Sequence, residues 1–398
     1  MARSFDPALA GPLQGVRVLD LSRLVAGNMA TLLLGDYGAD VIKIEHPEKG
    51  DDLRRWRAAG VETFWKVYGR NKRSLALDIR KGEGRTAFTR LLKTTQVLVE
   101  NFVPGTLEKW GYGEPELLAI NPDLVILRIS GWGQTGPYRD RPGFGTLVEA
   151  MSGFAHLNGF PDRPPALPPL AMADMVAGLY GAFAVLAALR VVEQGKGSKE
   201  GRGQSIDLSL FEPMLSLVAS EAVKHRVTGT VTMRSGNQAP HTAPRNVYRC
   251  ADGGFIAVSG SMQSMAELIL VTIGRPELVT DPRFATNDAR VENRDELDGI
   301  INGFTGARSL PEILAAFEAA GVPCAPVYAM DQLVTDPYVL GRGALTELED
   351  RDLGSVPMHE IVPRLSVTPG TFRYPAPQLG EHTAEILAEI AQLEDLPA

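Results

Sequence analysis

The chain has 398 residues, of which 44% are hydrophobic and 22% charged, a composition that allows a large core and two domains. Its 48 acidic and 40 basic residues give a formal charge of −8, which argues against nucleic acid as the main partner. Cys250 and Cys324 are too few for a disulfide framework and lack the spacing of a zinc site. The N-terminus also lacks the apolar core of a signal peptide, so we expect a cytoplasmic protein.

Strand and helix patterns alternate along the first 130 residues. Strands are predicted at residues 16–21, 40–45, 74–78, 95–100 and 124–129, and helices at 29–37 and 82–93. The strands are nearly continuous apolar runs, which is typical of a parallel sheet covered by helices on both faces. We therefore predict an α/β fold with a Rossmann-like large domain.

The most apolar segment lies at residues 175–189. As a helix it would be about 22 Å long, short of the roughly 30 Å of a bilayer core, so it predicts a buried helix and no membrane contact. The glycine-rich segment that follows, residues 195–204, lacks the phosphate-loop pattern and is predicted to be a solvent loop.

The second half of the chain predicts a smaller α+β domain. After an irregular polar stretch, residues 247–258 predict a hairpin that turns at Asp252-Gly253. Helical patterns follow at 261–273, 294–304 and 309–320, and a final helix follows the segment LGEHTAEIL.

A glycine motif follows the strand predicted at 124–129. Gly131, Gly133 and Gly136 spell G-x-G-x-x-G, the fingerprint of a dinucleotide-binding turn. That fingerprint must open a helix whose first N–H groups hold the pyrophosphate, but Pro137 and Pro142 occupy the expected helical turns. A dinucleotide oxidoreductase is therefore disfavoured, and a loop that contacts another ligand is favoured.

Seven segments together resemble the class III coenzyme A transferases of the CaiB/BaiF type. This family includes formyl-CoA:oxalate and carnitine CoA-transferases and is related to α-methylacyl-CoA racemase. The segments cover nearly the whole chain in the family's order: LDLSRLVAGNMATLLLGDYGADVIKIEHPEKGD, GRNKRSLALDIR, VLVENFVPGTLEKWGYG, ISGWGQTGPY, MADMVAGLYGAFAVLAALR, GRGQSIDLSL and LGEHTAEIL.

The resemblance implies an interlocked homodimer whose large domain is built from both ends of each chain. We accordingly expect a large domain at residues 1–222, a small domain at 223–329, and a segment at 330–398 that returns to the large domain. The implied substrates are an acyl-CoA thioester and a carboxylic acid, with no tightly bound cofactor.

The resemblance also identifies Asp174 as the catalytic residue, because it matches the aspartate of the family's AD-x-x-x-G pattern. The local sequence is compatible, since Asp174 begins the apolar helix, where free N–H groups and the helix dipole favour a carboxylate. From position alone, a role only as a helix cap is favoured, since aspartate is a preferred capping residue. The resemblance favours the nucleophile, which forms aspartyl anhydride and aspartyl-CoA thioester intermediates.

Other contacts follow from position in the family pattern. Ser130, Gly131 and Trp132 in the glycine loop, together with Val25 and Asn28, are expected on the substrate side. Asn28 replaces the usual proline of the family. The expected coenzyme A contacts are His46, Leu77, Arg80, Asn101, Phe102 and Lys109, with Lys72 and Arg73 assisting at phosphate.

Two alternatives share the resemblance. The racemase depends on a histidine in the segment where this chain has Phe144, and phenylalanine cannot transfer a proton. A non-catalytic CoA-binding relative is disfavoured because Asp174 is retained. The six histidines are scattered, so no metal site is predicted.

The acids exchanged are the least specified part of the prediction. The features of oxalate-type enzymes are absent, because Val25 replaces a glutamine and the segment at 259–265 is not glycine-rich. A basic cluster surrounds Arg54, which could hold a second carboxylate or could be only an exposed helix face. We therefore expect succinyl-CoA or a related dicarboxylyl-CoA as the donor.

Overall fold

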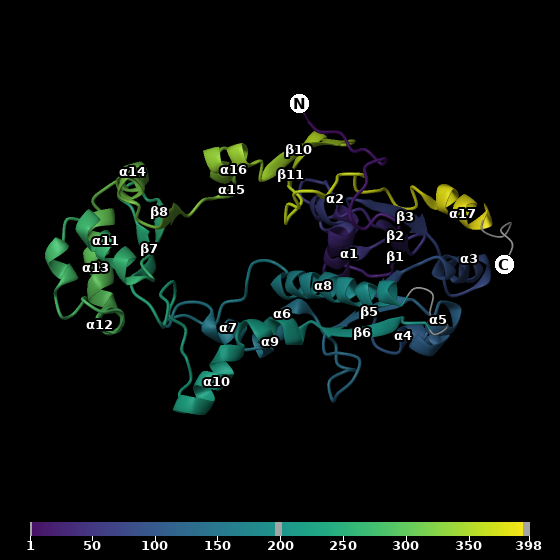
Figure 1. The fold of residues 1–398 in the computed structure, drawn as a ribbon, viewed down its shortest axis with the longest axis horizontal. Coiled ribbons are helices and arrows are strands. Elements are labelled where there is room, and N and C mark those ends of the chain that lie inside the picture. The colour runs from purple at the N-terminus through teal and green to yellow at the C-terminus, as the bar shows by residue number, and fades with distance from the viewer. Residues whose placement is uncertain (1, 196–200, 393–398) are drawn as a thin grey trace. The chain divides into compact units, whose positions relative to one another are not determined.

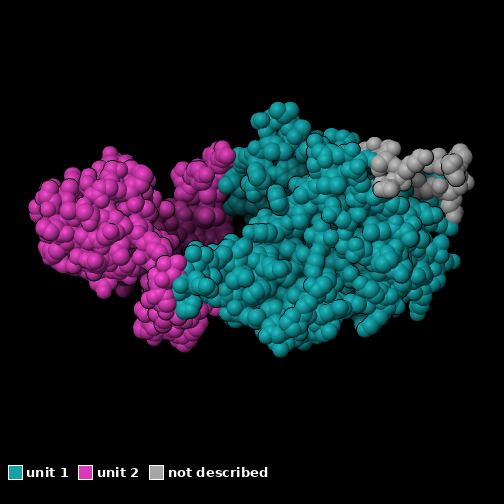
Figure 2. Space-filling view, turned by 60° about the horizontal axis from the view of Figure 1, so that its bottom comes forward, with its two compact units in different colours: residues 1–154, 167–226, 343–398 teal, residues 155–166, 227–342 magenta. Residues whose placement is uncertain are grey.

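The computed structural model describes residues 2–195 and 201–392. Its residues form two compact units, one within 1–154, 167–226 and 343–398 and the other within 155–166 and 227–342 (Figure 2). The second unit thus includes residues 155–166, which the sequence assigned to the large domain. It also continues to residue 342, beyond the expected boundary at 329. The core of the predicted solvent loop, 196–200, lies outside the described residues.

The first unit is built on a six-stranded sheet with the order β3-β2-β1-β4-β5-β6 (Figure 1). All five pairings between neighbouring strands are parallel. The strands are β1 (Arg17–Asp20), β2 (Asp40–Glu45), β3 (Lys72–Ala76), β4 (Val97–Glu100), β5 (Val125–Ser130) and β6 (Gln204–Ser209). This order is that of a doubly wound sheet, and it reverses between β1 and β4, where ligands commonly bind. The predicted α/β class is confirmed.

Both faces of the sheet are buried, which explains its continuous apolar runs. Val18 packs into the core on one face, whereas the next residue, Leu19, packs into the core on the other. The first core is covered by α1 (Ala26–Asp36), α6 (Gly145–Met151), α8 (Met172–Gln194) and α9 (Phe211–Leu217). The second is covered by α3 (Gly82–Lys93), α4 (Thr106–Lys109), α5 (Glu114–Ile120) and α17 (Thr383–Gln392).

Helix α8 is longer than the sequence suggested. It has 23 residues and is long and apolar enough to cross a membrane by length and composition alone. The length argument is therefore wrong, because it counted only the most apolar residues. The helix is also only half-buried. On its inner face, Gly178 packs so closely on α1 that a Cβ there would lie 2.6 Å from Met29 Cβ. Leu179, Tyr180 and Phe183 of its outer face are exposed.

Further elements lie wholly or, for α10, mainly within the first unit. They are the 3₁₀ helix η1 (Asp52–Arg55), α2 (Thr63–Tyr68), α10 (Ala219–Thr228) and the antiparallel pair β10 (Leu345–Asp350) and β11 (Gly354–His359). Helix α7 (Phe154–Leu157) spans the division between the two units.

The second unit has an antiparallel sheet of β7 (Arg245–Arg249), β8 (Phe255–Ser259) and β9 (Cys324–Pro326). The turn between β7 and β8 contains Gly253 at φ +88°, as the predicted hairpin requires. The helices are α11 (Gln263–Thr272), η2 (Pro276–Val279), α12 (Asn287–Glu292), α13 (Arg294–Thr305), α14 (Leu310–Ala320), α15 (Met330–Leu333) and α16 (Pro337–Arg342). The three longest match the predicted helical patterns within two residues.

Candidate active site

A cavity of about 370 Å³ lies at the carboxyl ends of β1 to β4, where the strand order reverses. Parallel strands bring the residues that follow each of them to one edge, so the lining comes from four separate segments. These residues include Ser22 and Arg23 after β1, His46 and Lys49 after β2, Leu77, Asp78 and Arg80 after β3, and Phe102 after β4. We call it the strand-end pocket.

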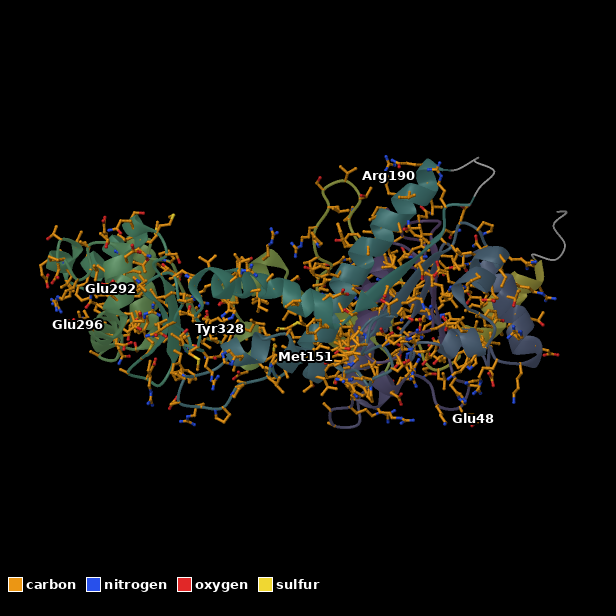
Figure 3. The ribbon with its side chains drawn as sticks, turned by 90° about the horizontal axis from the view of Figure 1, so that it is seen from below. Glu48, Met151, Arg190, Glu292, Glu296 and Tyr328 are labelled. Carbon is orange, nitrogen blue, oxygen red and sulfur yellow. The ribbon has the colours of Figure 1, made fainter. Side chains whose placement is uncertain are left out.

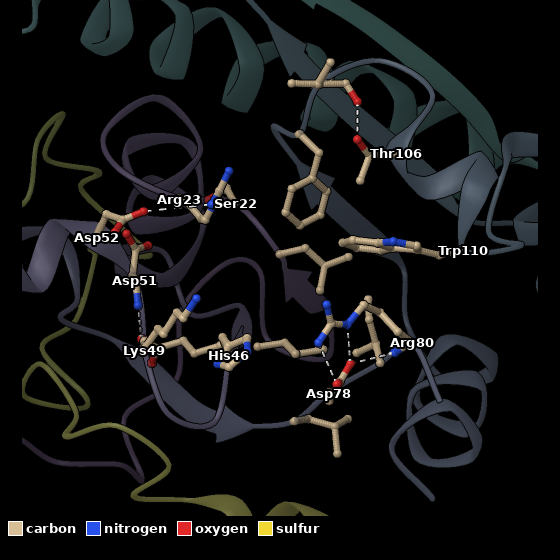
Figure 4. A pocket seen from close by; sticks show the side chains of 18 residues that line it. Ser22, Arg23, His46, Lys49, Asp51, Asp52, Asp78, Arg80, Thr106 and Trp110 are labelled. Carbon is tan, nitrogen blue, oxygen red and sulfur yellow. Dashed lines mark hydrogen bonds and ion pairs between the residues drawn. The ribbon is translucent and has the colours of Figure 1, made fainter. Parts of the chain in front are cut away.

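The walls of the strand-end pocket combine aromatic and charged groups (Figure 4). The rings of Phe102 and Trp110 meet edge to face with centroids 5.1 Å apart, and the Arg23 guanidinium lies 5.7 Å from the Phe102 ring. Arg80 is paired with Asp78 at 2.7 Å. Flat apolar surfaces beside cations suit a ligand with an aromatic base and phosphates.

Four of the predicted coenzyme A contacts line this pocket: His46, Leu77, Arg80 and Phe102. Asn101 instead binds the backbone of the loop after β1. Its side-chain amide accepts from Arg23 N at 2.8 Å and donates to Arg23 O at 2.7 Å. Lys109 is exposed at the end of α4, next to pocket-lining Trp110.

Lys72 and Arg73 do not reach the pocket. Lys72 is fully buried, and its ammonium contacts Asp20 at 3.2 Å and donates to Asn28 Oδ1 at 2.7 Å. Arg73 is bound to Asp40 at 2.8 Å and also pairs with two glutamates of α17. The structure contradicts a phosphate contact for either residue, because neither cation is open to a ligand.

Asn28 is likewise part of the interior and not of a pocket wall. Its amide donates to Asp51 Oδ2 at 2.7 Å and to Leu24 O at 2.6 Å. Asp51 also pairs with Lys43 at 2.9 Å, and Lys43 contacts Asp20 at 3.2 Å. We call Asp20, Asn28, Lys43, Asp51 and Lys72 the buried ion network.

The buried ion network supports the loop that carries Arg23. Leu24 has a left-handed backbone with φ +61°, which costs a non-glycine residue on the order of 1 kcal/mol or more. Its N–H donates to Asp51 Oδ1 at 2.9 Å. The network thus holds a strained residue beside the pocket.

The basic cluster predicted around Arg54 does not offer that residue to a substrate. Arg54 forms a bidentate pair with Glu45, with both N–O distances 2.8 Å, and stacks 3.8 Å from the Trp65 ring. Arg55 and Arg57 are exposed and pair with Asp52 and Glu62. Both line a second hollow, which shares Lys49 with the strand-end pocket.

Asp174 lies in the first turn of α8 but does not serve as its cap. The helix has Ala171 at the N-cap position, without a side-chain cap, and Glu149 of α6 accepts from Ala173 N at 3.0 Å. Burial, with the nearby Glu149 charge, raises the pKa of Asp174 to about 6. At neutral pH the carboxyl is mainly ionised, and it is more basic than an ordinary aspartate.

The glycine loop approaches this carboxyl through two close backbone contacts. A Cβ on Gly131 would lie 2.4 Å from Gly143 Cα, and one on Gly145 would lie 2.4 Å from Asp174 Oδ2. A side chain on Gly131 would clash with that backbone, whereas one on Gly145 would displace the end of the Asp174 side chain. Trp132 donates from Nε1 to Pro142 O at 3.1 Å, which joins the loop to the same segment. Ser130 Oγ is buried without a hydrogen-bond partner in the described chain.

Two further predicted positions are the N-cap residues of helices that pack on α8. Val25 is buried in a small cluster with Ala171 and Met175, so its side chain supports α8 and presents no surface to a substrate. Phe144, where the racemase relatives need histidine, is the exposed N-cap residue of α6. Among residues 2–195 and 201–392, no group of His, Cys, Asp or Glu is arranged to hold a metal ion.

Sequence reasoning missed Arg23, Lys49 and Trp110 in the pocket and Glu149 beside Asp174. The first two follow strand ends directly, so the rule that ligands bind at those ends could have found them. Glu149 gave no such signal, because it is 25 residues from Asp174 and only the packing of α6 on α8 joins them.

A family model described as CoA-transferase family III matches residues 13–383. The chain belongs to this family and is an enzyme that transfers CoA. In the family, it is 40% identical to a succinyl-CoA–D-citramalate CoA-transferase of Chloroflexus aurantiacus, covering 96% of this chain and 95% of that one. It is 36% identical to a succinate–glutarate CoA-transferase of Agrobacterium fabrum, covering 96% of each chain. A solved CaiB/BaiF family protein from Brucella suis superposes with a TM-score of 0.84 at 34% identity, covering 96% of this chain and all of that one.

Proposed function

We propose that this CoA-transferase takes CoA from succinyl-CoA and delivers it to a second dicarboxylic acid, with Asp174 as the nucleophile. The observation that carries the proposal is the Asp174 carboxyl itself. It lies against Gly145, has Glu149 as its charged neighbour and has a pKa of about 6. A carboxylate that is ionised at neutral pH yet more basic than usual is well suited to attack an acyl group.

The transfer proceeds in four exchanges. Asp174 Oδ bonds to the thioester carbonyl of succinyl-CoA, the C–S bond breaks, and CoA leaves as a thiolate. The thiolate attacks the aspartyl carbonyl of the mixed anhydride, which forms aspartyl-CoA and releases succinate. The acceptor carboxylate attacks that thioester and frees the thiolate again. The thiolate then attacks the acceptor acyl group, which produces the new acyl-CoA and restores Asp174.

The energetics of these exchanges require no other reactant. Each step breaks one acyl bond and forms another of similar energy, and a carboxylate or thiolate leaves each time. Backbone N–H groups of the loop that begins at Gly131 are candidates to hold the oxyanion of each tetrahedral intermediate. Ser130 Oγ, which has no partner in the described chain, is a further donor at the start of that loop.

The nucleotide end of CoA is assigned to the strand-end pocket. Phe102 and Trp110 provide an aromatic surface for the adenine, and Arg23, His46 and Lys49 provide donors for phosphate. The relatives named as succinyl-CoA–D-citramalate and succinate–glutarate CoA-transferases support a dicarboxylic acceptor of similar length.

The proposal includes a homodimer, as the family resemblance implies. It is supported by the exposed apolar outer face of α8, where Leu179, Phe183 and Leu186 recur at helical spacing. Light scattering of the purified chain measures its mass in solution. Phe183→Asp would shift a dimer toward monomer, and a chain that is monomeric before mutation would contradict the proposal.

The nucleophile is tested by mass spectrometry after incubation with succinyl-CoA and trapping with hydroxylamine or borohydride. We expect the adduct on Asp174 and the loss of at least about a thousandfold of transfer activity in Asp174→Ala. Glu193→Ala, at the other end of α8, is the matched control and should retain activity. An adduct elsewhere, or transfer that survives in Asp174→Ala, would overturn the proposal.

The acid pair is tested with a panel of donors and acceptors. Succinyl-CoA with C4 to C6 dicarboxylates should react well above succinyl-CoA with monocarboxylates of equal length. Activity restricted to monocarboxylates would refute the proposed acceptor class but would not contradict the proposed role of Asp174.

A further inference from the structure

Glu149 occupies an unusual place beside the nucleophile. Its side chain is buried, with the residue only 2% exposed, and Oε1 accepts from Ala173 N at 3.0 Å. Helix α8 has no side-chain cap of its own. An N-terminal helix N–H is normally satisfied by a residue of the same helix, and an aspartate in the first turn is a usual choice. Here a neighbouring helix supplies the acceptor, which leaves Asp174 available for chemistry.

Helix α6 presents two residues of one face to the nucleophile. Gly145 and Glu149 are four positions apart and therefore lie one above the other on the helix. Gly145 lets Asp174 Oδ2 approach its Cα, while Glu149 binds the N–H of the residue before Asp174. The same short helix thus fixes both the position of the carboxyl and the charge beside it.

Within the part of the chain that the structure describes, no cation forms an ion pair with either of these carboxyls. The only basic residue of α8 is Arg190, about 24 Å along the helix from Asp174, and Figure 3 shows it at the far end from Met151 of α6. Charged groups on the other elements that pack on α8 have partners of their own: Asp36 with Arg70, Arg128 with Glu100, Asp207 with Gln134 N, and Glu212 with Ser209. Of the charged groups on residues 2–195 and 201–392, Glu149 alone shifts the pKa of Asp174.

We propose that Glu149 is a positioning residue for CoA transfer, which caps α8 in place of Asp174 and whose negative charge favours the acylated states of the enzyme. This inference rests on the proposed role of Asp174 as nucleophile. In the free enzyme two carboxylates share a partly buried space. In the anhydride and in the aspartyl-CoA thioester the Asp174 group is neutral, so the repulsion is relieved. Glu149 therefore raises the energy of the free enzyme relative to both intermediates.

The decisive variant is Glu149→Gln, because it retains an acceptor for Ala173 N and removes the charge. The acid limb of the pH profile of kcat/KM should move to lower pH by about one unit, since Asp174 ionises more easily without a like charge. At fixed succinyl-CoA and succinate, the fraction of enzyme held as aspartyl-CoA thioester should fall several-fold. A purely structural role predicts neither change.

Glu193→Gln is the matched control, since it removes a carboxylate from the opposite end of α8 and should leave the acid limb in place. An unshifted limb in Glu149→Gln, with the Asp174 adduct still formed, would overturn this inference and leave the proposed function intact. Absence of the adduct in the unaltered enzyme would overturn both. Should Glu149→Gln fail to fold, the stability of Asp174→Asn tests the combined cost of burial and of the Glu149 charge without altering Glu149, and no gain at pH 7.5 would overturn the inference.

Discussion

Asp20 and Asp174 are both carboxylates that the first unit withdraws from water, but their surroundings differ in charge. Asp20 is fully buried, between the ammonium groups of Lys43 and Lys72, each 3.2 Å away. Asp174 has Glu149 as its charged neighbour. Burial raises the pKa of both groups, but the two lysines reverse the shift for Asp20 and bring its pKa to about 2, whereas the pKa of Asp174 rises to about 6.

The comparison separates a structural use of buried charge from a chemical one. The buried ion network satisfies each carboxylate with cations and hydrogen bonds, so it holds one protonation state and one geometry. The pair at Asp174 leaves charge uncompensated, which makes its ionised form reactive at a cost in stability. The loop after β1 lies between these regions: Leu24 is bound by Asp51, and Val25 packs beside Met175.

The largest effect should come from removing a cation of the buried ion network. Lys43→Met leaves Asp20 and Asp51 short of a buried partner, and should lower the free energy of unfolding by about 3–5 kcal/mol. Urea denaturation followed by circular dichroism measures the change. Lys93→Met, at the exposed end of α3, is the control. A loss below about 1 kcal/mol would show that the network adds little to stability.

Removal of the uncompensated charge of Asp174 should instead raise the free energy of unfolding. The native pKa of Asp174, about 6, exceeds the ordinary value of 3.8, so the native state loses stability as the pH rises through 6. Above pH 7 the penalty is complete and amounts to about 1–3 kcal/mol. Asp174→Asn should therefore be more stable than the unaltered enzyme at pH 7.5.

Stability measured as a function of pH checks this sign. The advantage of Asp174→Asn should shrink below pH 6 and vanish below about pH 3, where the aspartate is mainly protonated in both the folded and the unfolded state. An advantage that stays constant with pH would mean that the amide packs better, and that charge is not the cause.

The sequence predicted most of the sheet, although β6 was not among the predicted strands. Apolar runs predicted β1, β2, β4 and β5 to within two residues, because strands buried on both faces leave little choice of side chain. The motif order also led to Asp174. Strand ends explain why His46, Arg80 and Phe102 meet in one pocket, since parallel strands bring the residues after them to one edge.

The partners of charged side chains could not be predicted in the same way. Lys72 and Arg73 are adjacent to pocket-forming segments and carry the right charge for phosphate, yet partners 32 or more residues away in sequence occupy both. Arg54 is similar, since Glu45 takes its guanidinium. Such pairings depend on the folded geometry, so the sequence does not show whether a basic side chain already has an acidic partner.

A smaller effect is expected at Asn28, where this chain departs from the usual proline. Proline is compatible with the first turn of α1, where N–H groups lack intrahelical partners, but it removes the amide that joins Asp51 and Lys72. Asn28→Pro should lower the free energy of unfolding by about 2 kcal/mol. Equal stability would indicate that a water or a shifted Lys72 replaces the amide.

The smallest effect, on KM for succinyl-CoA, should distinguish the strand-end pocket from the region around Asp174. Arg23→Ala removes a cation of the strand-end pocket without touching Asp174, so KM for succinyl-CoA should rise about tenfold while kcat changes little. Arg55→Ala is a matched control, because both arginines pair with Asp52 but Arg55 lines the second hollow. A rise in KM for both variants would indicate that the overall positive potential of this surface attracts succinyl-CoA, and that Arg23 makes no specific contact. A fall in kcat confined to Arg23→Ala would instead show that the loop held by Asn101 transmits its position to α8 through Val25.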